Sequence, residues 1–169
     1  MPRVAHILNE LRPSGAEMML KLAGPIWAAQ GWQQHILSTG QNLGPFAREL
    51  AAVGFEITHC PEGKTFGWVS AYQRALQQIA PDVVQEHAEG LSLIKTSVPA
   101  LMGIKVFRTI HNVFEFKGYL RSTRMIERRL AKLLGVKTIT ISQSVCSNES
   151  QRFTNKSTLC WNWFDDSHF

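Results

Sequence analysis

Residues 3–22, "RVAHILNELRPSGAEMMLKL", combine a strand pattern, a turn and the start of a helix. The apolar run at residues 3–11 favours a buried β-strand, and Pro13 and Gly15 interrupt it. From Gly15 to residue 30, apolar side chains recur at helical spacing. A strand joined to a helix by a tight loop is the repeating unit of parallel α/β sheets.

The same alternation continues along the whole chain. Strand patterns are predicted at residues 3–11, 33–40, 55–60, 82–87, 105–112, 137–144 and 156–164. Helical patterns are predicted at residues 15–30, 45–54, 66–80, 90–103, 118–134 and 147–153. We therefore predict one α/β domain over residues 1–169. It is Rossmann-like and doubly wound, with a mainly parallel sheet of about six or seven strands and helices on both faces.

The composition is that of an ordinary soluble globular protein, with 44% apolar and 18% charged residues. No apolar run approaches the roughly 20 residues needed to span a bilayer, and the N-terminus lacks a signal-peptide pattern. These features predict a cytoplasmic protein. The three cysteines, Cys60, Cys146 and Cys160, form no CxxC pair, so neither a disulfide framework nor a zinc site is predicted.

Positive charge is concentrated in one part of the chain. The net charge is +5, and residues 103–137 contain nine Lys or Arg residues but only two Glu.

The helix predicted at 118–134 places apolar residues on one stripe, which we expect to face the core: Leu120, Met125, Ile126, Leu130, Leu133 and Leu134. Arg121, Arg124, Arg128 and Lys132 share the opposite, outer side of the helix at helical spacing, and Arg129 is also basic. This helix is either an ordinary amphipathic surface helix or a docking site for anionic lipid or a pyrophosphate-linked acceptor. Apart from Tyr119 the helix has no interleaved aromatic residue, which argues against nucleic acid.

Ligands of open α/β sheets bind beyond the carboxyl ends of the strands. After the first predicted strand come Ser14, Gly15 and Glu17. Gly15 permits close approach of a ligand to the backbone, whereas Ser14 and Glu17 also fit a capping box that involves no ligand. The loop lacks both GxGxxG and a P-loop pattern, which argues against a nucleotide-binding reductase.

Three later strand ends carry further candidates. His87 follows the fourth predicted strand, and His111 with Asn112 closes the fifth. Imidazole and amide groups can hydrogen-bond sugar hydroxyls, but a histidine at a strand end can equally be structural. Ser142 ends the sixth predicted strand, where it either binds substrate or caps the following helix.

These motifs occur in a recognisable order: "SGAE" (14–17), His87, "TIHN" (109–112), "ITISQSV" (139–145) and "LCWNWFDDSHF" (159–169). The chain resembles the N-terminal domain of retaining GT-B glycosyltransferases. The group in question is glycosyltransferase family four, which builds bacterial surface polysaccharides and glycolipids. The resemblance covers nearly all of the sequence. Residues 160–169 resemble the segment that crosses to the second domain. Two positions depart from the family pattern, because Ser14 and Trp163 stand where glycine is usual.

The resemblance implies an acceptor-binding half of an enzyme, inactive without a C-terminal donor-binding half. It implies a nucleotide-sugar co-substrate, a glycan or lipid-linked acceptor and no metal or other cofactor. By the same resemblance His111 is catalytic at the donor sugar, His87 faces the acceptor, and Gly15 lets backbone N–H groups approach the donor phosphates or the acceptor. The basic helix would then hold the enzyme on the inner face of the plasma membrane. The alternative is a stand-alone α/β module that docks to an anionic membrane or a protein partner through residues 118–134.

Overall fold

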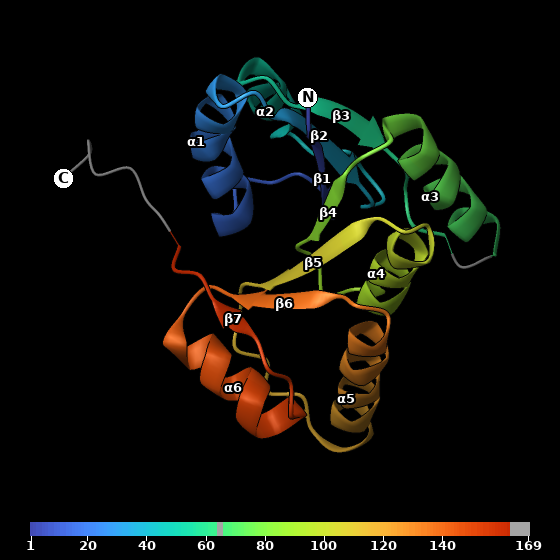
Figure 1. The fold of residues 1–169 in the computed structure, drawn as a ribbon, viewed down its shortest axis with the longest axis vertical. Helices are drawn as coiled ribbons and strands as arrows, with labels where there is room; N and C mark the ends of the chain where they lie inside the picture. Colours follow the sequence, from blue (N-terminus) through green and yellow to red (C-terminus); the bar gives the residue numbers. More distant parts are fainter. Residues whose placement is uncertain (64–65, 163–169) are drawn as a thin grey trace. The chain divides into compact units, whose positions relative to one another are not determined.

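The structure is a computed structural model that describes residues 1–63 and 66–162 (Figure 1). Its strands are β1 Arg3–Leu8, β2 Gln33–Ser38, β3 Glu56–His59, β4 Val83–Glu86, β5 Lys105–Ile110, β6 Lys137–Thr140 and β7 Thr158–Leu159. Its helices are α1 Gly15–Ala29, α2 Ala47–Ala52, α3 Phe66–Ile79, α4 Ser92–Leu101, α5 Gly118–Leu133 and α6 Gln143–Phe153. Within these residues the chain forms two compact units, residues 1–84 (unit 1) and residues 85–162 (unit 2).

The strands form one sheet in the order β3-β2-β1-β4-β5-β6-β7. Neighbouring strands run parallel, with Ile7 opposite Leu37 between β1 and β2 and Ile110 opposite Thr140 between β5 and β6. The predicted α/β, Rossmann-like fold with a parallel sheet of six or seven strands is therefore confirmed. The prediction of a single domain stays a prediction.

Unit 1 has its core around β1 and β2, whose residues are buried after the first position of each strand. Such continuous burial is typical of parallel strands covered on both faces. Leu20 of α1, Leu50 of α2 and Phe55 pack in the same cluster as Leu8 and Ile36. The apolar positions predicted for the first helix therefore contribute to the core.

Unit 2 contains β5, β6 and β7 with helices α4, α5 and α6. Helix α5 lies beside both α4 and α6 (Figure 1). Strand β6 ends at Thr140, sooner than predicted, because Ser142 begins the N-terminus of α6. The last predicted strand is confirmed only at Thr158–Leu159. Residues 163–169, most of the predicted crossing segment, lie outside the described residues.

Helix α5 does not bury the apolar face that the sequence predicted to be buried. Its buried residues are Arg128 and Ala131, whereas the predicted inner stripe is mostly exposed, with Leu133 82% and Ile126 53% accessible. The physical reason is that the Arg128 guanidinium pairs with the buried carboxylate of Glu149, while the small side chain of Ala131 permits close packing. The prediction that this stripe faces the core is wrong.

Among the described residues, no helix combines the length and the apolar character required to cross a membrane.

Candidate functional site

Two histidines lie in contact where neighbouring strands end. His87 follows β4 and His111 follows β5, and these strands are adjacent in the sheet. Nδ1 of His87 lies 2.9 Å from Nε2 of His111, at hydrogen-bonding distance. The rings stack with their centroids 5.2 Å apart. The prediction that both histidines lie at one edge of the sheet is confirmed, whereas their roles stay predictions.

The imidazole of His111 is neutral at ordinary pH. Burial lowers its pKa from 6.5 to about 4, because the charged form loses its hydration. A neutral imidazole has one N–H, so one ring of the pair donates and the other accepts. No group among the described residues hydrogen-bonds Nδ1 of His111. This nitrogen can therefore meet a ligand, as donor or acceptor according to the tautomer.

The loop after β5 is anchored to α6 through its backbone. The side-chain amide of Asn148 donates to the carbonyl of Phe114 at 3.3 Å, and the guanidinium of Arg152 donates to the carbonyl of Phe116 at 2.8 Å. The two phenylalanine rings stack at 5.1 Å. Asn112 is exposed at the start of this loop. The loop that carries the predicted sugar-binding residue is thus held in place by fixed contacts.

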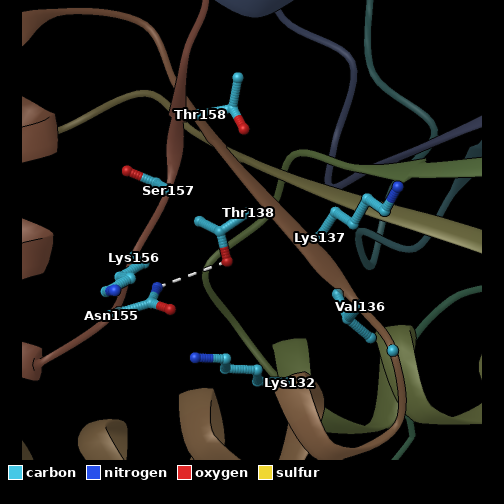
Figure 2. A pocket seen from close by; sticks show the side chains of 9 residues that line it. Lys132, Val136, Lys137, Thr138, Asn155, Lys156, Ser157 and Thr158 are labelled. Atoms are coloured by element: carbon cyan, nitrogen blue, oxygen red, sulfur yellow. Dashed lines mark hydrogen bonds between the residues drawn. The ribbon is translucent and has the colours of Figure 1, made fainter.

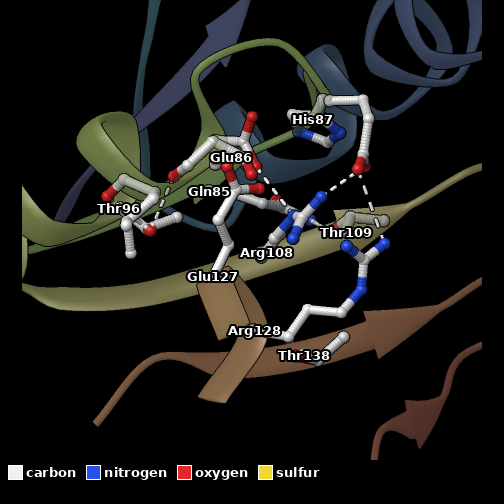
Figure 3. A network of polar contacts seen from close by, with 12 residues as sticks. Gln85, Glu86, His87, Thr96, Arg108, Thr109, Glu127, Arg128 and Thr138 are labelled. Carbon is white, nitrogen blue, oxygen red and sulfur yellow. Dashed lines mark hydrogen bonds and ion pairs between the residues drawn. The ribbon is translucent and has the colours of Figure 1, made fainter. Parts of the chain in front are cut away.

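The carboxylate of Glu89 contacts three guanidinium groups close to the histidine pair. It forms an ion pair with Arg108 and lies 3.5 Å from Nη2 of Arg128 and 3.9 Å from Nε of Arg124. Arg108 and Arg128 reach this region from β5 and α5 (Figure 3). Because Glu89 comes two residues after His87, these contacts fix the loop on which His87 lies.

A buried bidentate ion pair joins α5 to α6. Nε and Nη2 of Arg128 lie 2.7 Å and 2.9 Å from the two carboxylate oxygens of Glu149. The amide of Asn155 donates to the same carboxylate at 2.8 Å. The Arg128 guanidinium also lies over the ring of Phe153, 4.2 Å from its centroid. These contacts explain why Arg128 faces inward.

Glu86 is fully buried at the end of β4. Its Oε2 lies 3.3 Å from Nε of Arg108, but neither carboxylate oxygen makes a hydrogen bond of ordinary geometry with the described residues. Burial raises its pKa from 4.5 to about 8, because loss of hydration outweighs the attraction of Arg108 and Lys95. The carboxyl group is therefore mostly protonated at neutral pH, and Arg108 is balanced by Glu89.

Ser142 caps α6. Its hydroxyl oxygen accepts a hydrogen bond from the N–H of Val145 at 3.3 Å and lies 2.9 Å from the hydroxyl of Ser144. The capping alternative from the sequence is thus confirmed. The role of Ser142 in binding substrate stays a prediction.

The loop between β1 and α1 belongs to unit 1 and carries Ser14, Gly15 and Glu17. Ser14 is the N-cap residue, but its hydroxyl donates to the buried carboxylate of Glu17 and accepts nothing from the first turn. The prediction of capping-box hydrogen bonds is therefore wrong, because the carboxylate of Glu17 accepts the hydrogen bond of the Ser14 hydroxyl. A Cβ at Gly15 would meet no atom within 4 Å, so packing does not explain this glycine. Ligand contact at these residues stays a prediction.

The five basic residues predicted to dock a membrane or an acceptor have different surroundings. Arg129 and Lys132 are exposed, and Arg121 is exposed with its Nε donating to the carbonyl of Arg152 at 3.1 Å. Arg124 is half-buried and forms an ion pair with Glu127 at 2.7 Å. The prediction that Arg128 lies on the outer face is wrong, because its guanidinium is buried between carboxylates.

Sequence reasoning missed the buried charged residues Glu86 and Arg108 and the half-buried Glu89. A signal was available, because "DVVQEH" and "KVFRTIHN" each place a charged residue within an apolar strand. Charged residues are almost never fully buried without a partner. Glu86 and Arg108 on adjacent strands therefore indicated a charge network beneath the strand ends. Across the described residues, no group of three or more His, Cys, Asp or Glu side chains forms a metal-binding cluster.

No protein-family model matches the chain, and no curated protein matches it. Solved structures do match. A glycosyltransferase from Rickettsia africae is 14% identical, with a TM-score of 0.68 over 95% of this chain and 42% of that chain. HepE from Anabaena, in complex with UDP, is 15% identical, with a TM-score of 0.65 over 98% of this chain and 45% of that chain.

An epimerase also matches the chain. It is a UDP-GlcNAc 2-epimerase from Neisseria meningitidis bound to UDP-GlcNAc, 14% identical, with a TM-score of 0.56 over 92% of this chain and 45% of that chain. At these identities the likeness establishes the fold alone. The chain spans less than half the length of each of these proteins. It has the fold of one Rossmann-like half of the GT-B proteins, a fold that glycosyltransferases and epimerases share.

Proposed function

We propose that this chain is the acceptor-binding half of a retaining glycosyltransferase. The enzyme moves a sugar from a nucleotide-sugar donor to a glycan or lipid-linked acceptor, without a bound metal. His111 contacts the donor sugar, while His87, Asn112 and Ser142 contact hydroxyl groups of the substrates. In unit 1, the loop at Gly15 admits a phosphate or the acceptor. A second domain supplies most of the donor contacts, so the chain alone is inactive.

The observation that carries this proposal is the contact between His87 and His111. The pair presents a neutral imidazole nitrogen whose protein neighbours leave it available for a hydroxyl group. A hydroxyl ligand suits this nitrogen better than an anion does, because a neutral ring adds no positive charge to the site. The Glu89 contacts hold His87, and the loop anchored by Asn148 holds the segment after His111. The site is thus preorganised for an uncharged polar substrate such as a sugar.

The fold alone leaves a second chemistry open, since a solved epimerase also matches. The two reactions differ in their products. A transferase separates the sugar from the nucleotide and joins it to an acceptor, whereas an epimerase inverts one carbon of the sugar. Product analysis by NMR therefore separates the two.

Sugar transfer should depend on His111 in this chain assembled with a donor-binding domain. We expect His111→Ala to lower kcat about tenfold, the effect of losing one hydrogen bond of about 1.4 kcal/mol that strengthens in the transition state. The KM for donor should change less, because the contact acts mainly on the transition state. Transfer of radiolabelled sugar to acceptor measures both constants.

His59→Ala is the matched control, because His59 is exposed and, within the part of the chain that the structure describes, hydrogen-bonds only the carbonyl of Gly40, at 2.8 Å. It should leave kcat unchanged. A full kcat in His111→Ala would remove the catalytic assignment. An epimerised nucleotide-sugar as product would remove the transferase proposal itself.

A second candidate is an α/β module that docks on an anionic membrane. The observation that favours it is the exposed apolar stripe of α5, formed by Tyr119, Ile126, Leu130 and Leu133. These positions share one helix face, and the exposed Arg129 lies beside them. Apolar and basic groups on one helix face are what a helix lying in a membrane interface requires.

Vesicle sedimentation tests this candidate. Leu133→Ser should lower partition into vesicles of phosphatidylcholine and phosphatidylglycerol about tenfold, because burying a leucine contributes about 1.5 kcal/mol or more. Arg129→Glu should weaken binding further and make it less sensitive to salt. Leu101→Ser is the control, because Leu101 is 74% exposed at the end of α4, outside the stripe. Equal losses in both serine variants would refute docking through α5.

A further inference from the structure

A shallow pocket lies at the amino-terminal ends of β6 and β7, within unit 2 (Figure 2). Its volume is about 380 Å³. The end of α5 and its following turn, the start of β6 and the segment that enters β7 line it: Lys132, Gly135, Val136, Lys137, Thr138, Asn155, Lys156, Ser157 and Thr158. We call this the lysine pocket. Lys132, from the basic helix, and Asn155, which donates to Glu149, also belong to the contacts described for α5 and α6.

The lysine pocket is positively charged. Of the described residues that line it, three are lysines and none is Asp or Glu. None of the three forms an ion pair with an acidic group of the described chain. Lys132 and Lys156 extend toward the same side of the pocket, whereas Lys137 points the opposite way (Figure 2). The Lys137 ammonium lies over the ring of Phe107, 5.9 Å from its centroid. Two ammonium groups are thus available to one ligand.

The wall between these lysines is polar and held by internal hydrogen bonds. The amide of Asn155 lies 3.4 Å from the hydroxyl of Thr138 (Figure 2) and donates to the buried Glu149 carboxylate at 2.8 Å. The hydroxyls of Ser157 and Thr140 lie 3.2 Å apart. Because Asn155 and Arg128 already satisfy Glu149, this carboxylate does not neutralise the lysines. The Ser157 hydroxyl donates to Sγ of Cys146 at 3.6 Å, whereas the Thr138 hydroxyl accepts from Asn155 and keeps its own proton for a ligand. The pocket therefore offers one hydroxyl donor, from Thr138, beside two cations.

The lysine pocket lies away from the histidine pair. Lys137 is opposite Phe107 in the β5–β6 ladder, and Thr140 is opposite Ile110, the residue before His111. Three residues of strand separate these levels, roughly 10 Å along the sheet. A ligand in the pocket therefore occupies the amino-terminal edge, whereas the histidines serve the carboxyl edge.

We propose that the lysine pocket is a phosphate-binding site, with Lys132 and Lys156 as its charged ligands and Thr138 as a hydroxyl donor. A phosphate monoester has several acceptor oxygens and about two negative charges. It therefore matches two ammonium groups and a hydroxyl better than a ligand with a single carboxylate does. The phosphate belongs either to a soluble phosphate ester or to a lipid headgroup. This site is independent of the proposed sugar transfer.

The test uses glycerol 3-phosphate as the probe and amide NMR of the whole chain at physiological salt, where diffuse surface charge is screened. We expect saturable shifts at the amides of Thr138, Ser157 and Thr158. The double variant Lys132→Gln/Lys156→Gln should weaken this binding at least tenfold. Both side chains are exposed, so the spectrum of the variant should otherwise keep the native pattern.

A matched control removes the same charge elsewhere: Lys117→Gln/Arg48→Gln, two exposed residues outside the pocket. It should keep the affinity of the parent protein. Loss of binding in this control to the same extent would reveal a non-specific charge effect and overturn the site. Shifts that never saturate, or that persist unchanged in Lys132→Gln/Lys156→Gln, would overturn it as well.

Vesicles identify the source of the phosphate. Phosphatidic acid presents a phosphate monoester, so a lipid ligand predicts sedimentation with phosphatidic acid vesicles that glycerol 3-phosphate reverses and that Lys132→Gln/Lys156→Gln abolishes. A soluble ligand predicts the NMR response with no difference between the variants in sedimentation. Neither measurement involves sugar transfer, so failure here and failure of the proposed function are distinguishable.

Discussion

Glu149→Gln should lower the free energy of unfolding by about 3–5 kcal/mol, the usual cost of removing one partner from a buried ion pair. The Arg128 and Glu149 side chains are only 1% and 0% exposed. Without the Glu149 charge, the acidic group that remains beside the Arg128 guanidinium, among the residues that the structure describes, is the more distant Glu89 carboxylate, at 3.5 Å. Urea unfolding followed by circular dichroism measures the change.

Glu127→Gln provides the comparison that isolates burial. Glu127 also pairs with an arginine, Arg124, at the same 2.7 Å distance, but the two side chains are 20% and 19% exposed. Pairs that are open to solvent contribute about 0–1 kcal/mol. Equal destabilisation by the two variants would contradict a special role for the buried pair. Replacing both Arg128 and Glu149 with methionine should cost less than Glu149→Gln, because it leaves no uncompensated charge.

The buried pair also explains the main failure of sequence reasoning. Periodicity correctly located α5, but it assigned the leucine face to the core. A hydrophobic pattern locates an apolar stripe on a helix, but it does not show whether that stripe packs against the core. Here Glu149 and Glu89, 21 and 39 residues away from Arg128, determine which face turns inward. No local rule could supply partners so distant in sequence.

The strands were predictable for a contrasting reason. Strands β1, β2 and β5 each contain β-branched or other apolar residues beside polar ones, and most of their residues after the first are buried. Their alternation with helices led directly to the parallel sheet. The order of strands then placed His87 and His111 on adjacent strands. Their contact at 2.9 Å could not be predicted, because it depends on how β4 and β5 are aligned, and the local sequence does not determine that alignment.

At Ser14 the sequence predicted the N-cap residue correctly, but it predicted the hydrogen bonds of that residue incorrectly. The spacing of Ser14 and Glu17 fits a capping box, and Ser14 is indeed the N-cap residue. The burial of Glu17, which depends on tertiary packing, redirects the hydroxyl to its carboxylate. At Ser142, where no acid competes, the predicted cap forms.

Glu86→Gln should remove a strong dependence of stability on pH. In the folded protein the pKa of Glu86 is about 8, above its ordinary value of 4.5. Between these values the folded state binds more protons than the unfolded state, so stability falls as pH rises, by up to about 1.4 kcal/mol for each pH unit. The contribution is fully present below pH 4.5 and is lost as pH rises through about 8. Glutamine keeps the shape of the protonated carboxyl group and never ionises.

The free energy of unfolding, measured by urea titration at pH 5, 6, 7 and 8, should therefore diverge between the parent protein and Glu86→Gln. The two should be similar at pH 5, because the Glu86 oxygens make no ordinary hydrogen bond that glutamine would lose. At pH 8 the variant should be more stable, by on the order of 3 kcal/mol. Other ionisable groups are common to both proteins and cancel in the difference.

Glu115→Gln, at an exposed loop position, is the control, and its stability should run parallel to that of the parent at every pH. If the Glu86→Gln curve also ran parallel, Glu86 would be ionised in the folded protein. Arg108 would then be shared between Glu86 and Glu89, and the loop that carries His87 would be held by a larger charged network.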